Sequence, residues 1–183
     1  MVVVLFAERH SEDVVWLAGA MARAFARRAP KREVALALDR LNPATLPPEI
    51  LAVDTTGLTP RDIFGRMRQL SAQGMAVVSA STGRTERALA TFDAADRILL
   101  VADLSVPAIR GLQRTIKLVD SLGLTHQRTP VVLYDCREDA GISPSEVASV
   151  LSREVFALLP PGSDGPADEA ACAALVDRLL LPS

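Results

Sequence analysis

Short apolar runs alternate along this chain with longer segments of helical periodicity, and this alternation limits the fold more than any other feature. Each run is apolar throughout, as expected for a strand that is buried on both faces. Strands separated by helices predict a mostly parallel sheet that helices cover on both sides. We therefore expect an α/β fold, a single three-layer domain with a doubly wound sheet of about seven strands. The expected strands are 2–6, 34–38, 50–53, 75–79, 98–102, 131–134 and a weaker 155–158.

The segments between these runs predict six helices. Apolar residues recur every three or four positions from Val14 to Phe25, with Ser11 as the expected N-cap. Pro60 suits the first turn of the next helix. Glycine and proline predict a flexible loop over 160–166, before a last helix that we expect to pack against the sheet. The expected helices are 14–28, 59–70, 84–92, 106–122, 143–152 and 167–181.

Composition sets the size and the setting of this domain. The chain has 183 residues, of which 49% are hydrophobic and only 4% aromatic. It therefore has enough apolar side chains for one domain over 1–183, with a core of small aliphatic residues. A net charge of -2 gives no general attraction to nucleic acid. Cys136 and Cys172 form no CxxC pair or Cys/His cluster, which argues against a disulfide framework and a zinc site. Early charges and the lack of a long apolar run favour a cytoplasmic protein.

The loop between the first strand and the first helix reads "AERHSED" and covers residues 7–13. A strand, a loop and a helix in this order are the geometry in which many α/β proteins hold phosphate. Such a loop needs glycines for close approach of the backbone and usually a lysine for the charge. This loop has neither, and Glu8, Glu12 and Asp13 would repel a polyphosphate. The local shape is therefore expected without the phosphate chemistry.

The stretch from 75 to 160 carries a family resemblance. It contains "DAADRILLV" at 93–101, then "DLSVPAIRGLQRTIKLVDSLG", then "PVVLYDCREDAGISPSEVASVLSREVFALLP" at 130–160. In order and spacing it resembles the ParA/MinD group of deviant P-loop ATPases, and within that group the CpaE/TadZ proteins of Flp-type (Tad) pilus assembly and polar positioning. Short apolar strands and "AAD" are common singly, so the weight of the resemblance lies in their order.

The resemblance implies nucleotide-binding residues that this chain lacks. The family has a Gly-rich loop ending in Gly-Lys-Thr/Ser, a magnesium-associated acid after the fourth strand and a base-recognising asparagine after the sixth. The family's water-activating acid at the end of the second strand is retained, although a turn role is favoured for it. We expect a pseudo-ATPase without cofactor or metal. The corresponding positions are Glu8, Arg9, His10, Ser11, Glu12 and Asp13 in the loop, Asp39 and Ser79 for the acids, and Tyr134 or Asp135 for the asparagine.

Several other side chains are candidate contacts, each with an ordinary alternative. His10 suits pH sensing or proton acceptance, and Cys136 suits a reactive thiol, but neither has a partner group nearby in sequence. One cluster at the end of a strand could bind an anion, and the alternative is an ordinary role in a turn and helix cap. One cationic helix face could bind an acidic partner, and the alternative is a face exposed to solvent. The cluster is Ser81, Thr82, Gly83 and Arg84, and the face is Arg110, Arg114 and Lys117.

A receiver domain of two-component signalling is an alternative interpretation. Asp54 ends the third strand and Ser79 ends the fourth, which would make Asp54 a phosphoacceptor. A receiver also needs a pair of acids after the first strand and a lysine after the fifth. Here Glu8 is at best one acid and "VADLSVP" has no lysine, so we expect Asp54 at a turn.

The expected function is binding rather than catalysis. The resemblance implies a scaffold, localisation or regulatory protein that acts through protein contacts in pilus assembly or secretion, as a homodimer or as a heterodimer with an active paralogue. We expect no nucleic acid partner, and a position at the membrane or cell pole only through a partner. The alternatives are a nucleotide-dependent dimerisation switch with unconventional ATP binding, and the receiver.

Overall fold

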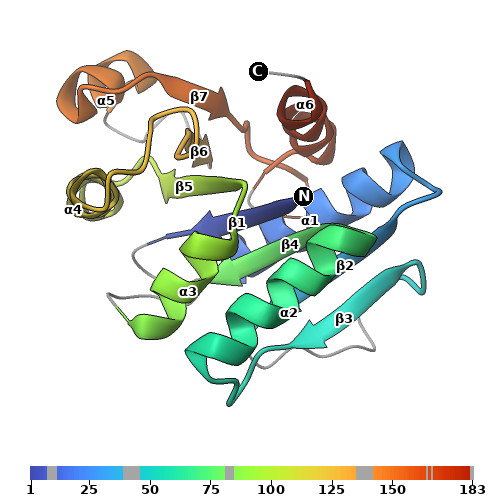
Figure 1. The fold of residues 1–183 in the computed structure, drawn as a ribbon. Coiled ribbons are helices and arrows are strands. Elements are labelled where there is room, and N and C mark those ends of the chain that lie inside the picture. Colours follow the sequence, from blue (N-terminus) through green and yellow to red (C-terminus); the bar gives the residue numbers. More distant parts are fainter. Residues whose placement is uncertain are drawn as a thin grey trace.

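Seven parallel strands form one sheet in the order β3-β2-β4-β1-β5-β6-β7 (Figure 1). The computed structural model describes residues 1–7, 12–38, 46–80, 85–134, 142–163, 165 and 167–181. The expected fold class is confirmed. The strands are β1 (Val2–Phe6), β2 (Glu33–Leu38), β3 (Ile50–Asp54), β4 (Gly74–Ala80), β5 (Arg97–Asp103), β6 (Val131–Tyr134) and β7 (Val155–Leu158).

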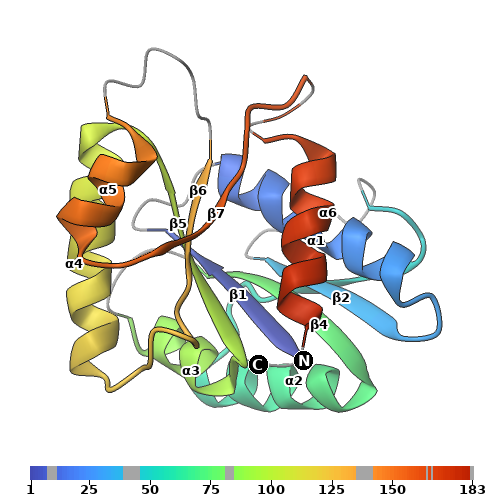
Figure 2. The same cartoon turned by 90° about the horizontal axis from the view of Figure 1, so that it is seen from above.

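Six helices cover the two faces of the sheet, four on one face and two on the other (Figures 1 and 2). Side chains of β1 alternate between the two cores, with Val2, Val4 and Phe6 on the side of α2 to α5, and Val3 and Leu5 on the side of α1 and α6. The expected three layers are therefore present. The helices are α1 (Glu12–Arg28), α2 (Pro60–Gln73), α3 (Glu86–Ala94), α4 (Val106–Ser121), α5 (Pro144–Leu151) and α6 (Glu169–Leu180).

Polar caps set where several helices begin. Thr59 accepts a hydrogen bond from the Asp62 amide, and the Asp62 carboxylate accepts one from the Thr59 amide, which forms a capping box before α2. Ser143 and Glu146 form the same arrangement before α5, and these hydrogen bonds lower the pKa of Glu146. The helices expected at 59 and 143 therefore begin one residue later, because a cap lies outside the helix proper.

The crossovers create a switch point in the middle of the sheet. From β1 the chain passes to α1 on one face, whereas from the neighbouring strand β5 it passes to α4 on the other. Loops that leave two adjacent strands in opposite directions open a crevice beyond their carboxyl ends, where open α/β sheets bind their ligands. The fold thus places a candidate site beyond β1 and β5.

Helix α6 packs beside α1 and shares the core on that face of the sheet, where the sequence predicted packing against the sheet. Cys172, Leu175 and Leu179 are buried in the core that α1 shares. Arg23 of α1 pairs with Glu169 of α6 at 2.9 Å. Among the described residues, no helix combines the length and the apolar character that crossing a membrane requires.

Burial raises the pKa of the Cys172 thiol to about 11, and the nearby Asp168 and Glu169 act in the same direction. Because the thiolate is the reactive form, we expect Cys172 in a Cys136→Ser variant to react with a disulfide reagent at pH 8 at least about a hundredfold more slowly in the folded protein than in urea. Absorbance of the released thiol gives both rates. Equal rates would show that Cys172 is accessible and would contradict its burial.

Candidate functional site

A pocket of about 550 Å³ lies at the switch point. The carboxyl ends of β1, β5 and β6 form its base, and the first turn of α1 and residues 107–115 of α4 form its sides. Its volume is in the range of small-molecule sites. The pocket is therefore where this fold is expected to hold a ligand.

Among the described residues, two carboxylates and two guanidinium groups line this pocket. Asp13 comes from the first turn of α1 and Asp103 from the end of β5, while Arg110 and Arg114 come from α4. The Tyr134 hydroxyl donates to the Asp13 carboxylate at 3.4 Å. The acidic groups therefore come from the start of α1 and the end of β5, and the basic groups come from α4.

The first turn of α1 is acidic at a position where a phosphate-binding site needs positive charge. An α-helix N-terminus attracts anions, but the first turn of α1 contains Glu12 and Asp13. The Asp103 carboxylate is engaged by the Ser105 amide at 2.7 Å, and Ser105 in turn caps α4. Glu12 and Asp13 therefore place negative charge at a helix end that would otherwise attract an anion.

Ser79 lies near the end of β4, beside a very small polar cavity. This cavity of about 20 Å³ is also lined by Thr55, Arg87 and Thr91, and Arg87 donates to the Thr55 carbonyl at 2.8 Å. A space of this size accommodates about one water molecule. Among the residues that the structure describes, no three His, Cys, Asp or Glu side chains gather as metal ligands.

Asp54 has the turn role that we expected. It is exposed at the end of β3, and its carboxylate accepts a hydrogen bond from the Thr56 amide at 2.9 Å. The sheet order also differs from the 2-1-3-4-5 order of flavodoxin-like and receiver-type sheets. The receiver alternative does not fit this topology.

The structure brings only part of the predicted site together. Asp13, Tyr134, Arg110 and Arg114 share the switch-point pocket, whereas Lys117 is exposed further along α4. Sequence reasoning missed Asp103, although the "DLS" turn after an apolar strand is a usable signal. The remaining predicted residues lie outside the described part of the chain: Glu8, Arg9, His10, Ser11, Asp39, Ser81, Thr82, Gly83, Arg84, Asp135 and Cys136.

Solved structures with a similar fold include MinD and ParA family proteins. No protein-family profile and no curated protein sequence matches the chain. A MinD cell division protein from Aquifex aeolicus matches with a TM-score of 0.79 and 14% identity, over 100% of this chain and 98% of that one. A ParA family ATPase from Chlorobium tepidum matches with a TM-score of 0.75 and 13% identity, over 99% and 93%.

The sheet order and the crossovers define a doubly wound α/β protein with a pocket at the carboxyl edge of its sheet. More specifically, the chain has the fold of the MinD and ParA ATPases over its whole length. At these identities the likeness establishes the fold alone, because proteins that share a fold can differ in the chemistry of their sites.

Proposed function

We propose that this protein is a non-catalytic relative of the MinD and ParA ATPases that acts as a scaffold, localisation or regulatory protein through protein contacts. The observation that carries the proposal is the acidic first turn of α1, where Glu12 and Asp13 stand at the expected phosphate position. Asp13 also lines the switch-point pocket and accepts a hydrogen bond from Tyr134.

Electrostatics support the loss of phosphate binding. A carboxylate about 4 Å from a phosphate charge costs about 1 kcal/mol in water and about 4 kcal/mol near a protein surface. A helix N-terminus stabilises an anion by only about 0.3 to 1 kcal/mol, and by about 2 kcal/mol in favourable cases. With two carboxylates in the first turn of α1, a third at Glu8, and no glycine or lysine between residues 7 and 13, repulsion exceeds attraction.

The α4 side of the pocket supports a role in partner binding. Arg110, Arg114 and Lys117 follow one another at spacings of four and three, and all three are exposed. Val106, at the start of the same helix, is 47% exposed. An apolar contact beside three positive charges suits an acidic protein surface.

The proposal extends to the setting that the sequence resemblance implies. A similar structure is the MinC:MinD cell division protein complex from Aquifex aeolicus, in which a protein of this fold binds a protein partner. For this chain we propose a homodimer or a heterodimer with an active paralogue, and a CpaE/TadZ-like role in pilus assembly or secretion. A position at the membrane or the cell pole would then come through the partner.

A nucleotide titration tests the proposal. We expect no saturable heat when ATP or ADP is added in a calorimeter, with or without magnesium, because the acidic turn repels the phosphates. The sedimentation coefficient is expected to stay the same before and after addition.

Saturable binding coupled to dimerisation would contradict the proposal and favour a nucleotide-dependent switch. An Arg110→Gln/Arg114→Gln variant would then show whether the nucleotide occupies the switch-point pocket, because these side chains are its cationic lining. Weaker binding by this variant would place the nucleotide there, and unchanged binding would place it elsewhere.

A further inference from the structure

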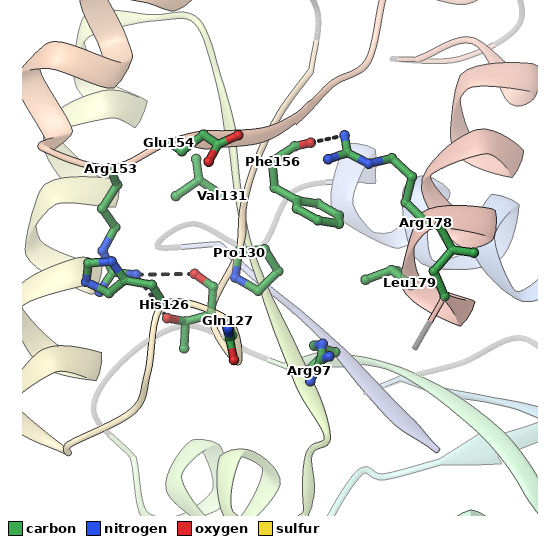
Figure 3. Close-up of a pocket in the computed structure, with 12 residues that line it drawn as sticks. Arg97, His126, Gln127, Pro130, Val131, Arg153, Glu154, Phe156, Arg178 and Leu179 are labelled. Atoms are coloured by element: carbon green, nitrogen blue, oxygen red, sulfur yellow. Dashed lines mark hydrogen bonds between the residues drawn. The ribbon is translucent and has the colours of Figure 1, made fainter. Parts of the chain in front are cut away.

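A second pocket lies at the opposite edge of the sheet, beside the amino ends of β5, β6 and β7 (Figure 3). Its volume is about 450 Å³, and the end of α6 closes one side of it. The proposed function does not use this edge, since parallel strands turn their carboxyl ends the other way. This pocket is therefore separate from the switch-point pocket and from the function proposed for it.

Positive charge dominates the lining of this amino-edge pocket. Arg97, Arg153, Arg178 and His126 line it, and Glu154 is the only acidic residue among the described lining residues. The whole chain has a net charge of -2, so this cationic excess is local. Asp120 compensates the charge of Arg153, and an anion in the hollow would reduce the repulsion among the other guanidinium groups.

Arg153 is held rigidly in the wall. The residue is 7% exposed, and one of its terminal nitrogens donates to the Thr129 hydroxyl at 2.9 Å and to the Thr129 carbonyl at 3.2 Å. The other terminal nitrogen pairs with Asp120. The Nε atom of Arg153 is buried and has no hydrogen-bond partner among the described residues. An unmet donor of this kind has a cost in folding free energy.

Arg178 is positioned from the other side by an aromatic ring. Its guanidinium lies over the Phe156 ring, 4.1 Å from the ring centre, and donates to the Phe156 carbonyl (Figure 3). Stacking of this kind holds the planar fork in one orientation and leaves its remaining donors for another acceptor. Two fixed guanidinium groups thus flank the hollow.

The pocket also has an apolar part. Pro130, Val131, Phe156 and Leu179 contribute apolar surface between the charged side chains. An inorganic ion alone would leave this surface uncovered, and a purely apolar molecule would leave the guanidinium groups uncompensated.

We infer that the amino-edge pocket binds a small organic anion, with a carboxylate or phosphate group at the arginines and an apolar body on Pro130, Phe156 and Leu179. Both head groups offer paired oxygens that match the fork of a guanidinium. The volume of about 450 Å³ fits a small molecule of this kind.

Amide NMR of the full chain tests the inference with defined probes. The probes are hexanoate and hexyl phosphate, with hexanol, hexylammonium and inorganic phosphate as comparisons. We expect saturable shifts of the Thr129, Val131 and Phe156 amides with the two organic anions. Hexanol, hexylammonium and inorganic phosphate should bind at least about tenfold more weakly, because each lacks one of the two features that the pocket recognises.

Matched arginine variants locate the effect. Arg178→Gln should weaken the binding of hexyl phosphate about tenfold, the change expected when a charge-assisted hydrogen bond is lost. Arg61→Gln is the control, because Arg61 is an exposed residue at the start of α2, on the carboxyl side of the sheet. Thermal unfolding followed by circular dichroism checks that both variants are folded.

Three results would overturn the inference. The first is equal binding of hexyl phosphate by the Arg178→Gln and Arg61→Gln variants. The second is equal binding of hexanol and hexanoate. The third is that neither organic anion causes saturable shifts at the amino-edge pocket. Shifts confined to the Ala102 and Asp103 amides, at the other edge of the sheet, would count as this third result.

Discussion

Replacing Phe92 with alanine is expected to lower the free energy of unfolding by about 4 kcal/mol, because it empties a large site in the core. Phe92 on α3 is 2% exposed, and its ring meets Phe6 of β1 edge to face with the ring centres 4.9 Å apart. The chain is only 4% aromatic, so the surrounding small aliphatic side chains cannot refill the volume. Urea unfolding followed by circular dichroism measures the loss.

Phe64→Ala is the matched control for this prediction. Phe64 lies on the neighbouring helix α2, but it is 41% exposed. Its removal should cost about 1 kcal/mol or less, because little buried volume is lost. Equal losses in the two variants would mean that the ring contact between Phe6 and Phe92 does not stabilise the core.

A Gly74→Ala substitution is expected to cost about 3 kcal/mol through a backbone clash. A Cβ atom at Gly74 would lie 2.0 Å from the Glu33 carbonyl oxygen. Glu33 and Gly74 are register partners where β2 and β4 pair, so the clash can be relieved only by moving two central strands apart. The midpoint of urea denaturation should fall accordingly.

Gly65→Ala should act in the opposite direction. Gly65 lies inside α2, and nothing stands within 4 Å of the position of a new Cβ atom. Alanine stabilises an exposed helix interior by about 1 kcal/mol relative to glycine. A loss of stability at Gly65 would contradict the open space at this position of α2, and no loss at Gly74 would contradict the close approach of β2 and β4.

The sequence predicted most helices and strands because the apolar runs of the strands and the three-to-four-residue spacing of apolar side chains in the helices are both strong in this chain. Strands β1, β6 and β7 have the expected bounds. Other strands extend into polar residues such as Glu33, Arg97 and Asp103, which hydropathy assigns to loops. These residues still pair, because the hydrogen bonds of a ladder need only backbone groups.

The candidate site was less predictable for a topological reason. Arg110 and Arg114 were found because helical spacing brings them together locally. Arg97, Arg153 and Arg178 lie on separate elements far apart in the sequence, and only the order of β5, β6 and β7 and the packing of α6 bring them together. Local patterns carry no information about such a cluster.

Strand β5 contributes to both pockets, and this has a consequence for occupancy. Arg97, at its first position, lines the amino-edge pocket, and Asp103, at its last, lines the switch-point pocket. A strand of 7 residues separates its two ends by about 20 Å. Two ligands at that separation do not collide, so occupation of one pocket leaves the other accessible.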